Sequence, residues 1–397
     1  MLSTGFMAAP GGFSATLSNK LDKVDCSQVL RAVMVADKQL LGHIKMGPVG
    51  RNIECNWIED ELNPAYVKCS GSANNIITLS AGYSTASLQR FLRKYTVLNP
   101  AGTEVYVQTA ASIAALTATV SAYGSTTWAS WTMTKCYIVA QPWADIDSAS
   151  SDASATRTKR KNFMQVFERA VEITQTRKNM DMEAVIDELQ TQIKYRTLEI
   201  KSLLDRSVIL GYARATASNT YSGDHELRTM AGIIQLIRDT NLDSTNEDAT
   251  VINASSSALT VARLNSLCYK VWDAGGLDET SDPILVMGAD QHRVFAAFDK
   301  EYRRDVATGE RTVGYYKNVF LSDMGMEIPV VLDRWVPKDK VILLDRSRIS
   351  LRPMAGDDWH LEKMAKTGRN EKWQLSGQFT IELANANKCH ALCYNLT

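Results

Sequence analysis

The residues that could do chemistry are few, and the most concentrated of them is a run of three carboxylates, Glu59-Asp60-Glu61. Paired carboxylates can serve as general acid and general base, but three consecutive side chains cannot all share one face of a helix or strand. A solvated or partner-facing acidic patch is therefore the simpler interpretation. A basic run, Thr156–Lys161 (TRTKRK), could contact phosphates without sequence preference, although such runs are more often solvated loops.

Histidines and cysteines show no metal-site spacing. No two histidines lie three or four residues apart, which excludes a pair of ligands on one helix face. His292 stands in a predicted helix, where a surface or core role is favoured over catalysis. Cys389 and Cys393 lack the second pair of ligands that structural zinc needs, and the odd number of cysteines, seven, predicts reduced thiols. The other histidines are His43, His225, His360 and His390.

The common catalytic and nucleotide-binding motifs are absent. The sequence contains no GxxxxGK[ST], GxGxxG, HExxH or GxSxG. We therefore predict no catalytic, cofactor-binding or metal-binding residues and no enzymatic activity.

Composition favours self-association. The chain has 397 residues, 45% hydrophobic and 22% charged, with 44 basic and 44 acidic residues and no net charge. A neutral chain gives no electrostatic case for sequence-specific nucleic-acid binding and does not repel its own copies. No segment approaches the roughly 20 apolar residues of a membrane span, and no signal peptide is visible.

One long helix dominates the predicted elements. Residues 181–210 contain no Gly or Pro, and their apolar residues recur every three or four positions. At about 1.5 Å rise per residue this helix would be roughly 45 Å long, ending at Gly211. The apolar stripe comprises Met182, Ile186, Leu189, Ile193, Ile200, Leu204 and Val208. The charged side comprises Asp181, Glu183, Asp187, Glu188, Lys194, Arg196, Glu199, Lys201, Asp205 and Arg206. No second long helix is available to pair with it, so it must lie along something else.

The remaining pattern predicts an α+β fold. Residues 1–20 are an extended arm, which we expect to be held against a neighbour, and 26–41 a short helix. Residues 70–155 form a β-rich module with strands at 103–109, 116–120 and 130–140, followed by a polar loop at 148–161. Residues 227–237 are buried, and 239–258 form a polar loop. Helices are predicted at 259–272 and 289–298, and strands at 283–287, 327–333, 340–345, 349–352, 373–383 and 391–394. Four of the eight tryptophans precede residue 150, which favours interface roles for some of them.

Several short phrases occur in the order and spacing of a known family. They are Trp57–Asp60 (WIED), Asn162–Thr174 (NFMQVFERAVEIT), Arg228–Ile233 (RTMAGI), Ser322–Gly325 (SDMG), Leu344-Asp345, Lys366–Gly368 (KTG), Gly377–Leu383 (GQFTIEL) and Asn385. Together with the long helix, this set resembles the major capsid proteins of tailed bacteriophages, which have the Hong Kong 97-type shell fold. The resemblance extends from about Trp57 to Tyr394.

The resemblance implies an α+β capsid architecture in which arms and loops reach onto neighbouring subunits. An extended β-rich loop accompanies a peripheral domain, with a long spine helix, and an axial domain. Mapped onto this sequence, the parts are an N-terminal arm (1–55), the extended loop with a β-rich insertion (56–165), the peripheral domain with the spine helix (166–230), the axial domain (231–345), peripheral strands (346–383) and a final axial strand (384–397).

The resemblance also implies a function. We expect a major capsid protein whose copies assemble into hexamers and pentamers of an icosahedral shell around double-stranded phage DNA. The expected partners are other copies, a portal protein, scaffolding or decoration proteins, and DNA contacted without sequence preference; no membrane and no cofactor are expected. The chain would lie in the virion capsid after assembly in the host cytoplasm. Some members cross-link subunits through a lysine–asparagine bond, but no motif here locates such a pair.

Two alternatives remain open. An encapsulin-type nanocompartment would keep the fold and change the cargo, but the enlarged β-rich module argues against it. A hydrolase or transferase in the α/β half would need a nucleophile–base pattern, which the sequence lacks. Within the capsid interpretation, we expect the acidic run Glu59–Glu61 and the basic run Thr156–Lys161 to meet across subunits.

Overall fold

The computed structural model describes residues 40–60, 66–72, 76–79, 96–98, 104–107, 117–122, 131–140, 157–179, 187–213, 220–221, 225–226, 228–240, 250–298, 303–307, 316–365 and 368–397. They divide into two compact units. The first lies within residues 1–55, 162–240 and 250–397, and the second within residues 56–161 and 241–249. The predicted arm at 1–20 and residues 26–39 of the predicted helix lie outside the described residues; Leu40–Gly42 form a short 3-10 helix.

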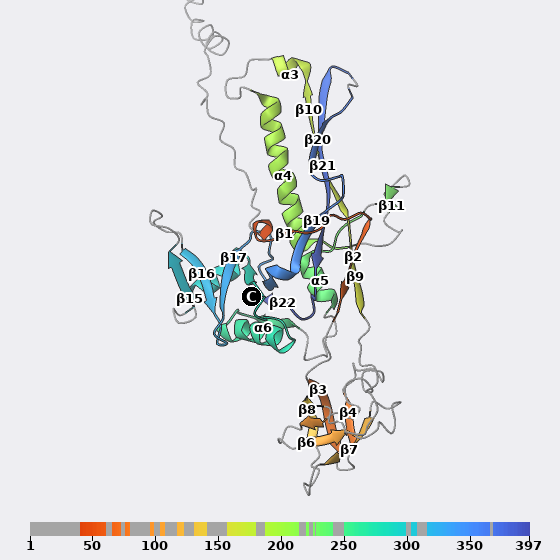
Figure 1. Ribbon diagram of the computed structural model, residues 1–397. Helices are drawn as coiled ribbons and strands as arrows, with labels where there is room; N and C mark the ends of the chain where they lie inside the picture. The colour runs from red at the N-terminus through yellow and green to blue at the C-terminus, as the bar shows by residue number, and fades with distance from the viewer. Residues whose placement is uncertain are drawn as a thin grey trace, which may run out of the picture. The chain divides into compact units, whose positions relative to one another are not determined.

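A long, mainly antiparallel sheet, here called the long sheet, supports the spine helix α4 (Figure 1). Its strand order is β1-β19-β21-β10, and β20 pairs with β21. The strands are β1 (Lys45–Met46), β10 (Gln165–Thr174), β19 (Ile349–Pro353), β20 (His360–Lys363) and β21 (Asn370–Leu383). The predicted strands at 349–352 and 373–383 are confirmed as β19 and the later part of β21.

Helix α4 spans Glu188–Leu210, so the predicted start at residue 181 is wrong. Asp187 has extended backbone angles and caps the helix, because its side chain accepts a hydrogen bond from the Gln190 backbone N–H. Helical periodicity continues through a capping residue and does not reveal where the helix begins. At 1.5 Å per residue the helix is about 35 Å long. Gly211 ends it, as predicted.

The predicted charged side of α4 is also wrong at one position. Asp205 is fully buried, and Ser202 one turn earlier is 2% exposed. The last two turns are enclosed on more than one side, because α5 (Ile233–Thr240) packs there as well as the long sheet. The Arg206 guanidinium lies 4.7 Å from the Trp335 ring centroid. The apolar stripe is confirmed at Leu189, Ile200, Leu204 and Val208, which are buried, whereas Ile193 is half-buried. Met182 and Ile186 of the predicted stripe, and Asp181 and Glu183 of the predicted charged side, lie outside the described residues.

A seven-stranded sheet forms the second part of the first unit. Its order is β13-β22-β18-β14-β17-β16-β15. The strands are β13 (Val251–Ser257), β14 (Pro283–Met287), β15 (Arg303–Ala307), β16 (Tyr316–Leu321), β17 (Glu327–Leu332), β18 (Val341–Asp345) and β22 (Ala391–Leu396). The predicted strands at 283–287, 327–333, 340–345 and 391–394 are confirmed. The predicted polar loop at 239–258 is wrong over 251–257, where β13 pairs in parallel with β22.

Helices cover both faces of this sheet. One apolar core joins its strands to α6 (Val261–Asp273) and α7 (Ala289–Ala296). Another joins its opposite face to α5, the end of α4 and the long sheet. The predicted helices at 259–272 and 289–298 are thereby confirmed. The predicted buried segment at 227–237 is confirmed over its described residues, 228–237, which are buried or half-buried, and Leu227 lies outside the described residues.

The second unit contains the predicted β-rich module. Six strands close into a barrel with the order β3-β4-β7-β6-β5-β8. They are β3 (Tyr66–Ser72), β4 (Ile76–Leu79), β5 (Thr96–Leu98), β6 (Glu104–Val107), β7 (Thr117–Ala122) and β8 (Trp131–Ala140). A separate two-stranded ribbon pairs β2 (Glu54–Glu59) with β9 (Thr158–Phe163). The prediction of a loop through residue 161 is therefore wrong from Thr158 onward, because a polar ribbon lacks the apolar alternation that marks a half-buried strand.

Within the described part of the chain, no helix has the length and apolar character needed to cross a membrane.

Candidate functional site

The phrases that carry the family resemblance meet in space. Asn162 is 1% exposed, and its side-chain amide donates to the backbone oxygens of Ala231 (3.0 Å) and Ile381 (2.9 Å). Its side-chain oxygen accepts the Ala231 N–H at 2.8 Å. Gln165 accepts the Met230 N–H at 3.1 Å. The Asn and Gln thus fasten the RTMAGI segment to the start of β10.

Helix α4 packs along the long sheet. Its first turns place Leu189 and Ile193 against Val171, Ile173 and Trp373. Farther along, Ile200 and Leu204 join the core that contains Phe167 and Phe379. The helix therefore has a partner within its own chain, the sheet formed by β10 and β21, as the absence of a second long helix required.

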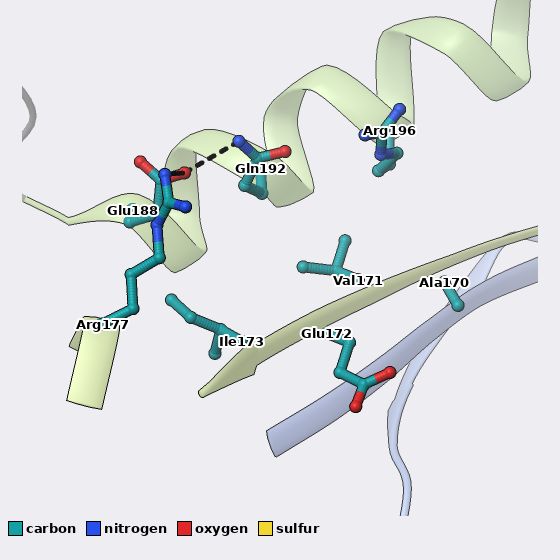
Figure 2. A pocket seen from close by; sticks show the side chains of 8 residues that line it. All are labelled: Ala170, Val171, Glu172, Ile173, Arg177, Glu188, Gln192 and Arg196. Carbon is teal, nitrogen blue, oxygen red and sulfur yellow. Dashed lines mark hydrogen bonds and ion pairs between the residues drawn. The ribbon is translucent and has the colours of Figure 1, made fainter. Parts of the chain in front are cut away.

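A cavity of about 200 Å³ opens between the first turns of α4 and the end of β10 (Figure 2). Glu188 accepts hydrogen bonds from Arg177 (3.3 Å) and from Gln192 (2.9 Å). Arg196 pairs with Glu199 on the next turn. Both arginines that line the cavity thus have carboxylate partners, and the cavity walls include Val171 and Ile173. This arrangement offers packing space and no evident reactive group.

The opposed charges of the sequence meet within one chain. Arg157 Nε lies 3.0 Å from Asp60 Oδ2, and Arg160 Nε lies 3.3 Å from Glu59 Oε2. Glu59 is buried and also accepts a hydrogen bond from Trp57 Nε1 at 3.0 Å. The expectation that these two runs pair across subunits is therefore wrong for Glu59 and Asp60, because the ribbon already places them beside the arginines. Glu61 lies outside the described residues.

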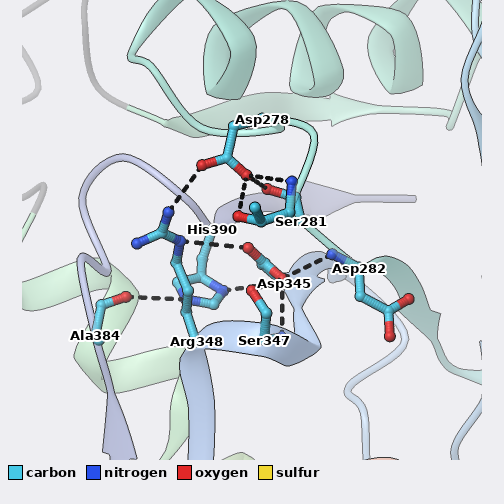
Figure 3. A network of polar contacts seen from close by, with 9 residues as sticks. Asp278, Ser281, Asp282, Asp345, Ser347, Arg348, Ala384 and His390 are labelled. Atoms are coloured by element: carbon cyan, nitrogen blue, oxygen red, sulfur yellow. Dashed lines mark hydrogen bonds and ion pairs between the residues drawn. The ribbon is translucent and has the colours of Figure 1, made fainter.

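A buried polar network occupies the junction between the two sheets, by which we mean residues 345–349 and 383–391, where the chain crosses from one sheet to the other (Figure 3). Asp345 Oδ1 accepts from the backbone N–H groups of Asp282 (3.0 Å) and Ser347 (2.9 Å) and from the Ser347 hydroxyl (2.7 Å). Burial raises the pKa of Asp345, but these hydrogen bonds outweigh burial and hold the pKa below its ordinary value.

The same network contains Arg348 and His390. Arg348 Nη2 donates to Asp278 at 3.1 Å, and Arg348 Nε lies 3.4 Å from Asp345 Oδ2. His390 is fully buried, and burial lowers its pKa to about 4. No sequence pattern indicates this network, because its members come from separate segments of the chain.

Sequence reasoning also missed a serine–histidine–aspartate trio. Ser376 Oγ lies 3.0 Å from His360 Nε2, and His360 Nδ1 lies 3.2 Å from Asp357 Oδ1. A hydrolase triad connects serine, histidine and aspartate in the same order through the two ring nitrogens. Ser376 is, however, paired on both sides, with Glu168 of β10 and His360 of β20, so its backbone is committed to the sheet and supplies no oxyanion hole. Only the β20–β21 register, which the sequence does not reveal, brings the three residues together.

The other candidate residues are at least partly buried. His292 lies on α7, where burial lowers its pKa. The six described cysteines are buried and form no disulfide with one another, and burial raises the pKa of Cys268, Cys389 and Cys393 to about 11. Among the described residues, no group of three His, Cys, Asp or Glu side chains could hold a metal ion.

Comparisons with known proteins identify the family. The sequence matches the SU10 major capsid protein family over residues 10–397. Its fold is similar to the capsid of the cyanophage A-1(L), with 10% identity, a TM-score of 0.56, and coverage of 96% of this chain and 99% of that one. It is also similar to the capsid of a native GTA particle, with 11% identity, a TM-score of 0.53 and full coverage of both chains. No curated protein sequence matches. The chain belongs to the SU10 major capsid protein family and is a phage major capsid protein with the Hong Kong 97-type fold.

Proposed function

We propose that copies of this chain assemble into hexamers and pentamers that close an icosahedral shell around double-stranded DNA. The observation that carries the proposal is the family match over nearly the whole chain, residues 10–397. The surface supports it. In the first unit, large apolar side chains are exposed along one stretch of sequence, at Met46 (58%), Val49 (50%) and Ile53 (47%). Exposed apolar residues of this kind are candidates for interaction surfaces, and identical neighbours in a shell would cover them.

The expected domain boundaries remain part of this proposal. We assign residues 1–55 to the arm, 56–165 to the extended loop, 166–230 and 346–383 to the peripheral domain, and 231–345 and 384–397 to the axial domain. The boundaries between the two compact units at residues 55–56 and 161–162 support the limits of the extended loop to within a few residues. Heterologous contacts between such subunits close into rings when the rotation fits.

The remaining partners follow from the same proposal. A shell that packages DNA needs a portal, and scaffolding or decoration proteins would bind copies of this chain. Contact with DNA would be weak and independent of sequence, because the chain has no net charge. Assembly would take place in the host cytoplasm.

Electron microscopy of the purified full-length chain tests the proposal. We expect capsomers or closed shells, and mass spectrometry of particles isolated from infected cells should find DNA and no packaged enzyme. A stable monomer in analytical ultracentrifugation across a range of salt concentrations would overturn the assembly proposal. An enzyme cargo would favour the nanocompartment alternative.

A further inference from the structure

His390 joins the two chain crossings of the junction. It lies directly before β22, where the chain re-enters the seven-stranded sheet, and it faces the end of β18, where the chain leaves that sheet (Figure 3). Its ring contacts one residue of each crossing. The Asp345 backbone N–H donates to His390 Nδ1 at 3.2 Å, and His390 Nε2 lies 3.3 Å from the Ala384 carbonyl oxygen just beyond β21.

These two bonds fix the state of the ring. Nδ1 faces an N–H donor and must accept, whereas Nε2 faces a carbonyl oxygen and must donate. Only the neutral imidazole with its proton on Nε2 satisfies both partners. A protonated ring would carry a second N–H, on Nδ1, directed at the Asp345 N–H, and this buried donor would lose its acceptor.

We propose that His390 is an acid-sensitive lock on the junction between the two sheets. While neutral, it ties β18, β22 and the end of β21 together. When protonated, it can no longer accept the Asp345 N–H, and the junction opens to let the imidazolium reach water.

Charged groups of both signs surround His390. The junction carries Asp345 from β18 and Asp278 and Asp282 from the loop before β14. Opposite them stand Arg346 and Arg348 from the short helix after β18, and Lys388 from the turn before β22. His43 contacts Arg346 at 3.4 Å. Burial is the largest influence on the ring and lowers the pKa of His390 to about 4; the Asp345 carboxylate and the Ala384 carbonyl oxygen act in the opposite direction, and Arg348 acts with burial.

The direction of the effect follows from linkage. The opened junction hydrates the ring and restores a pKa near 6.5, so the open state binds more protons than the closed state. Protection of the junction is therefore complete above about pH 6.5 and falls about tenfold per pH unit down to about pH 4. The Asp345 carboxylate affects stability only at a lower pH. Because its pKa is below the ordinary value, its stabilising contribution is lost only as the pH falls below the ordinary aspartate pKa.

Hydrogen exchange with mass spectrometry on the full-length chain tests the lock. Peptides covering 341–352 and 384–396 should lose protection between pH 6.5 and pH 4, after correction for intrinsic exchange rates, while the α6 peptide 261–273 stays protected. In His390→Asn the amide keeps an acceptor for the Asp345 N–H but cannot titrate, so protection should be independent of pH. His360→Asn, at a histidine outside the junction, should behave like the wild type.

An unchanged pH response in His390→Asn, or none in the wild type, would overturn the proposal. Should that variant not fold, exchange of the imidazole C2 hydrogen in the wild type decides the matter. We expect slow exchange at His390 with a midpoint well below 6.5. A midpoint near 6.5 with the junction still protected would also overturn it.

Discussion

Single polar side chains hold the backbone of this protein together where regular elements end. Asn162 is the strongest example, because it bonds two segments that lie 69 and 219 residues away in sequence. Sequence comparison singled out Asn162 and Gln165 only as letters of a family phrase. Their partners could not be derived from spacing, since the backbone of Met230 and Ala231 presents no side-chain signal. The trio Asp357, His360 and Ser376 escaped notice for the same reason: its contacts depend on strand register.

Replacing Asn162 with alanine should destabilise the first unit by about 3 kcal/mol. The substitution removes the acceptor of the buried Ala231 N–H and the donor to two buried carbonyl oxygens, and each orphaned group costs about 1–3 kcal/mol. Differential scanning calorimetry should show a lower melting temperature. Asn56→Ala, at an exposed position on β2, is the control and should change little. Equal melting temperatures for the two variants would contradict the role given to Asn162.

At the scale of elements, burial decided what the sequence could predict. Strands with continuous apolar runs, such as β14 and β18, were predicted within a residue or two, because few other structures bury such runs. Strands β9 and β13 were missed, because one belongs to a polar ribbon and the other is an irregular edge strand rich in serine. Ser255 and Ser256 have positive φ angles, 50° and 58°, which interrupt the strand pattern. The length of α4 was overestimated, because an N-cap aspartate fits the charged face of a helix.

The end of α4 depends on close backbone contact between two glycines. The Gly232 N–H donates to the Gly211 carbonyl oxygen at 2.8 Å, and a Cβ on Gly232 would lie 2.6 Å from the Gly211 backbone nitrogen. We expect Gly232→Ala to destabilise the protein by about 3 kcal/mol, because backbone atoms cannot move aside as side chains do. Gly42→Ala, where nothing lies within 4 Å of the added Cβ, is the matched control. Thermal unfolding of both variants measures the difference, and a harmless Gly232→Ala would refute the packing argument.

The stripe of α4 that faces the sheet should carry most of its stabilisation. Leu204 is 2% exposed and lies in the core shared by both sheets, whereas Leu210 on the last turn is 48% exposed. We expect Leu204→Ala to cost about 2–5 kcal/mol through lost burial and a residual cavity, and Leu210→Ala to cost less than about 1 kcal/mol. Urea unfolding followed by circular dichroism compares the two. Similar midpoints would mean that the helix is stabilised mainly by something other than this core.

At the scale of the whole molecule, family membership identifies the chain as one subunit of a larger shell. Membership of a family of structural capsid proteins confirms that the chain is not an enzyme and places it in the virion capsid. The composition and the absence of catalytic motifs also indicate a structural protein, but only the order of the short sequence segments along the chain predicts the fold. Neither the composition nor these segments locate the surfaces between subunits. Exposed apolar residues now suggest them, and two of these, Tyr269 (52%) and Trp272 (54%), lie on the outer side of α6 with ring centroids 6.5 Å apart.

Removing these two rings should impair assembly without affecting the subunit. Tyrosine and tryptophan dominate binding energy at interfaces, and the opposite side of α6 holds the core through Leu264, Leu267 and Val271. The double variant Tyr269→Ala/Trp272→Ala should therefore keep the circular dichroism and melting temperature of the wild-type subunit while its assembly, followed by sedimentation, weakens at least tenfold. Glu279→Ala, an exposed position just beyond α6, should assemble normally. Radical footprinting gives an answer that does not rely on variants, because both rings should be oxidised in free subunits and protected in shells. If both rings are oxidised equally in free subunits and in shells, these two residues do not lie in the subunit contact. That result would contradict the interface assigned to α6 but not the proposal that the subunits assemble.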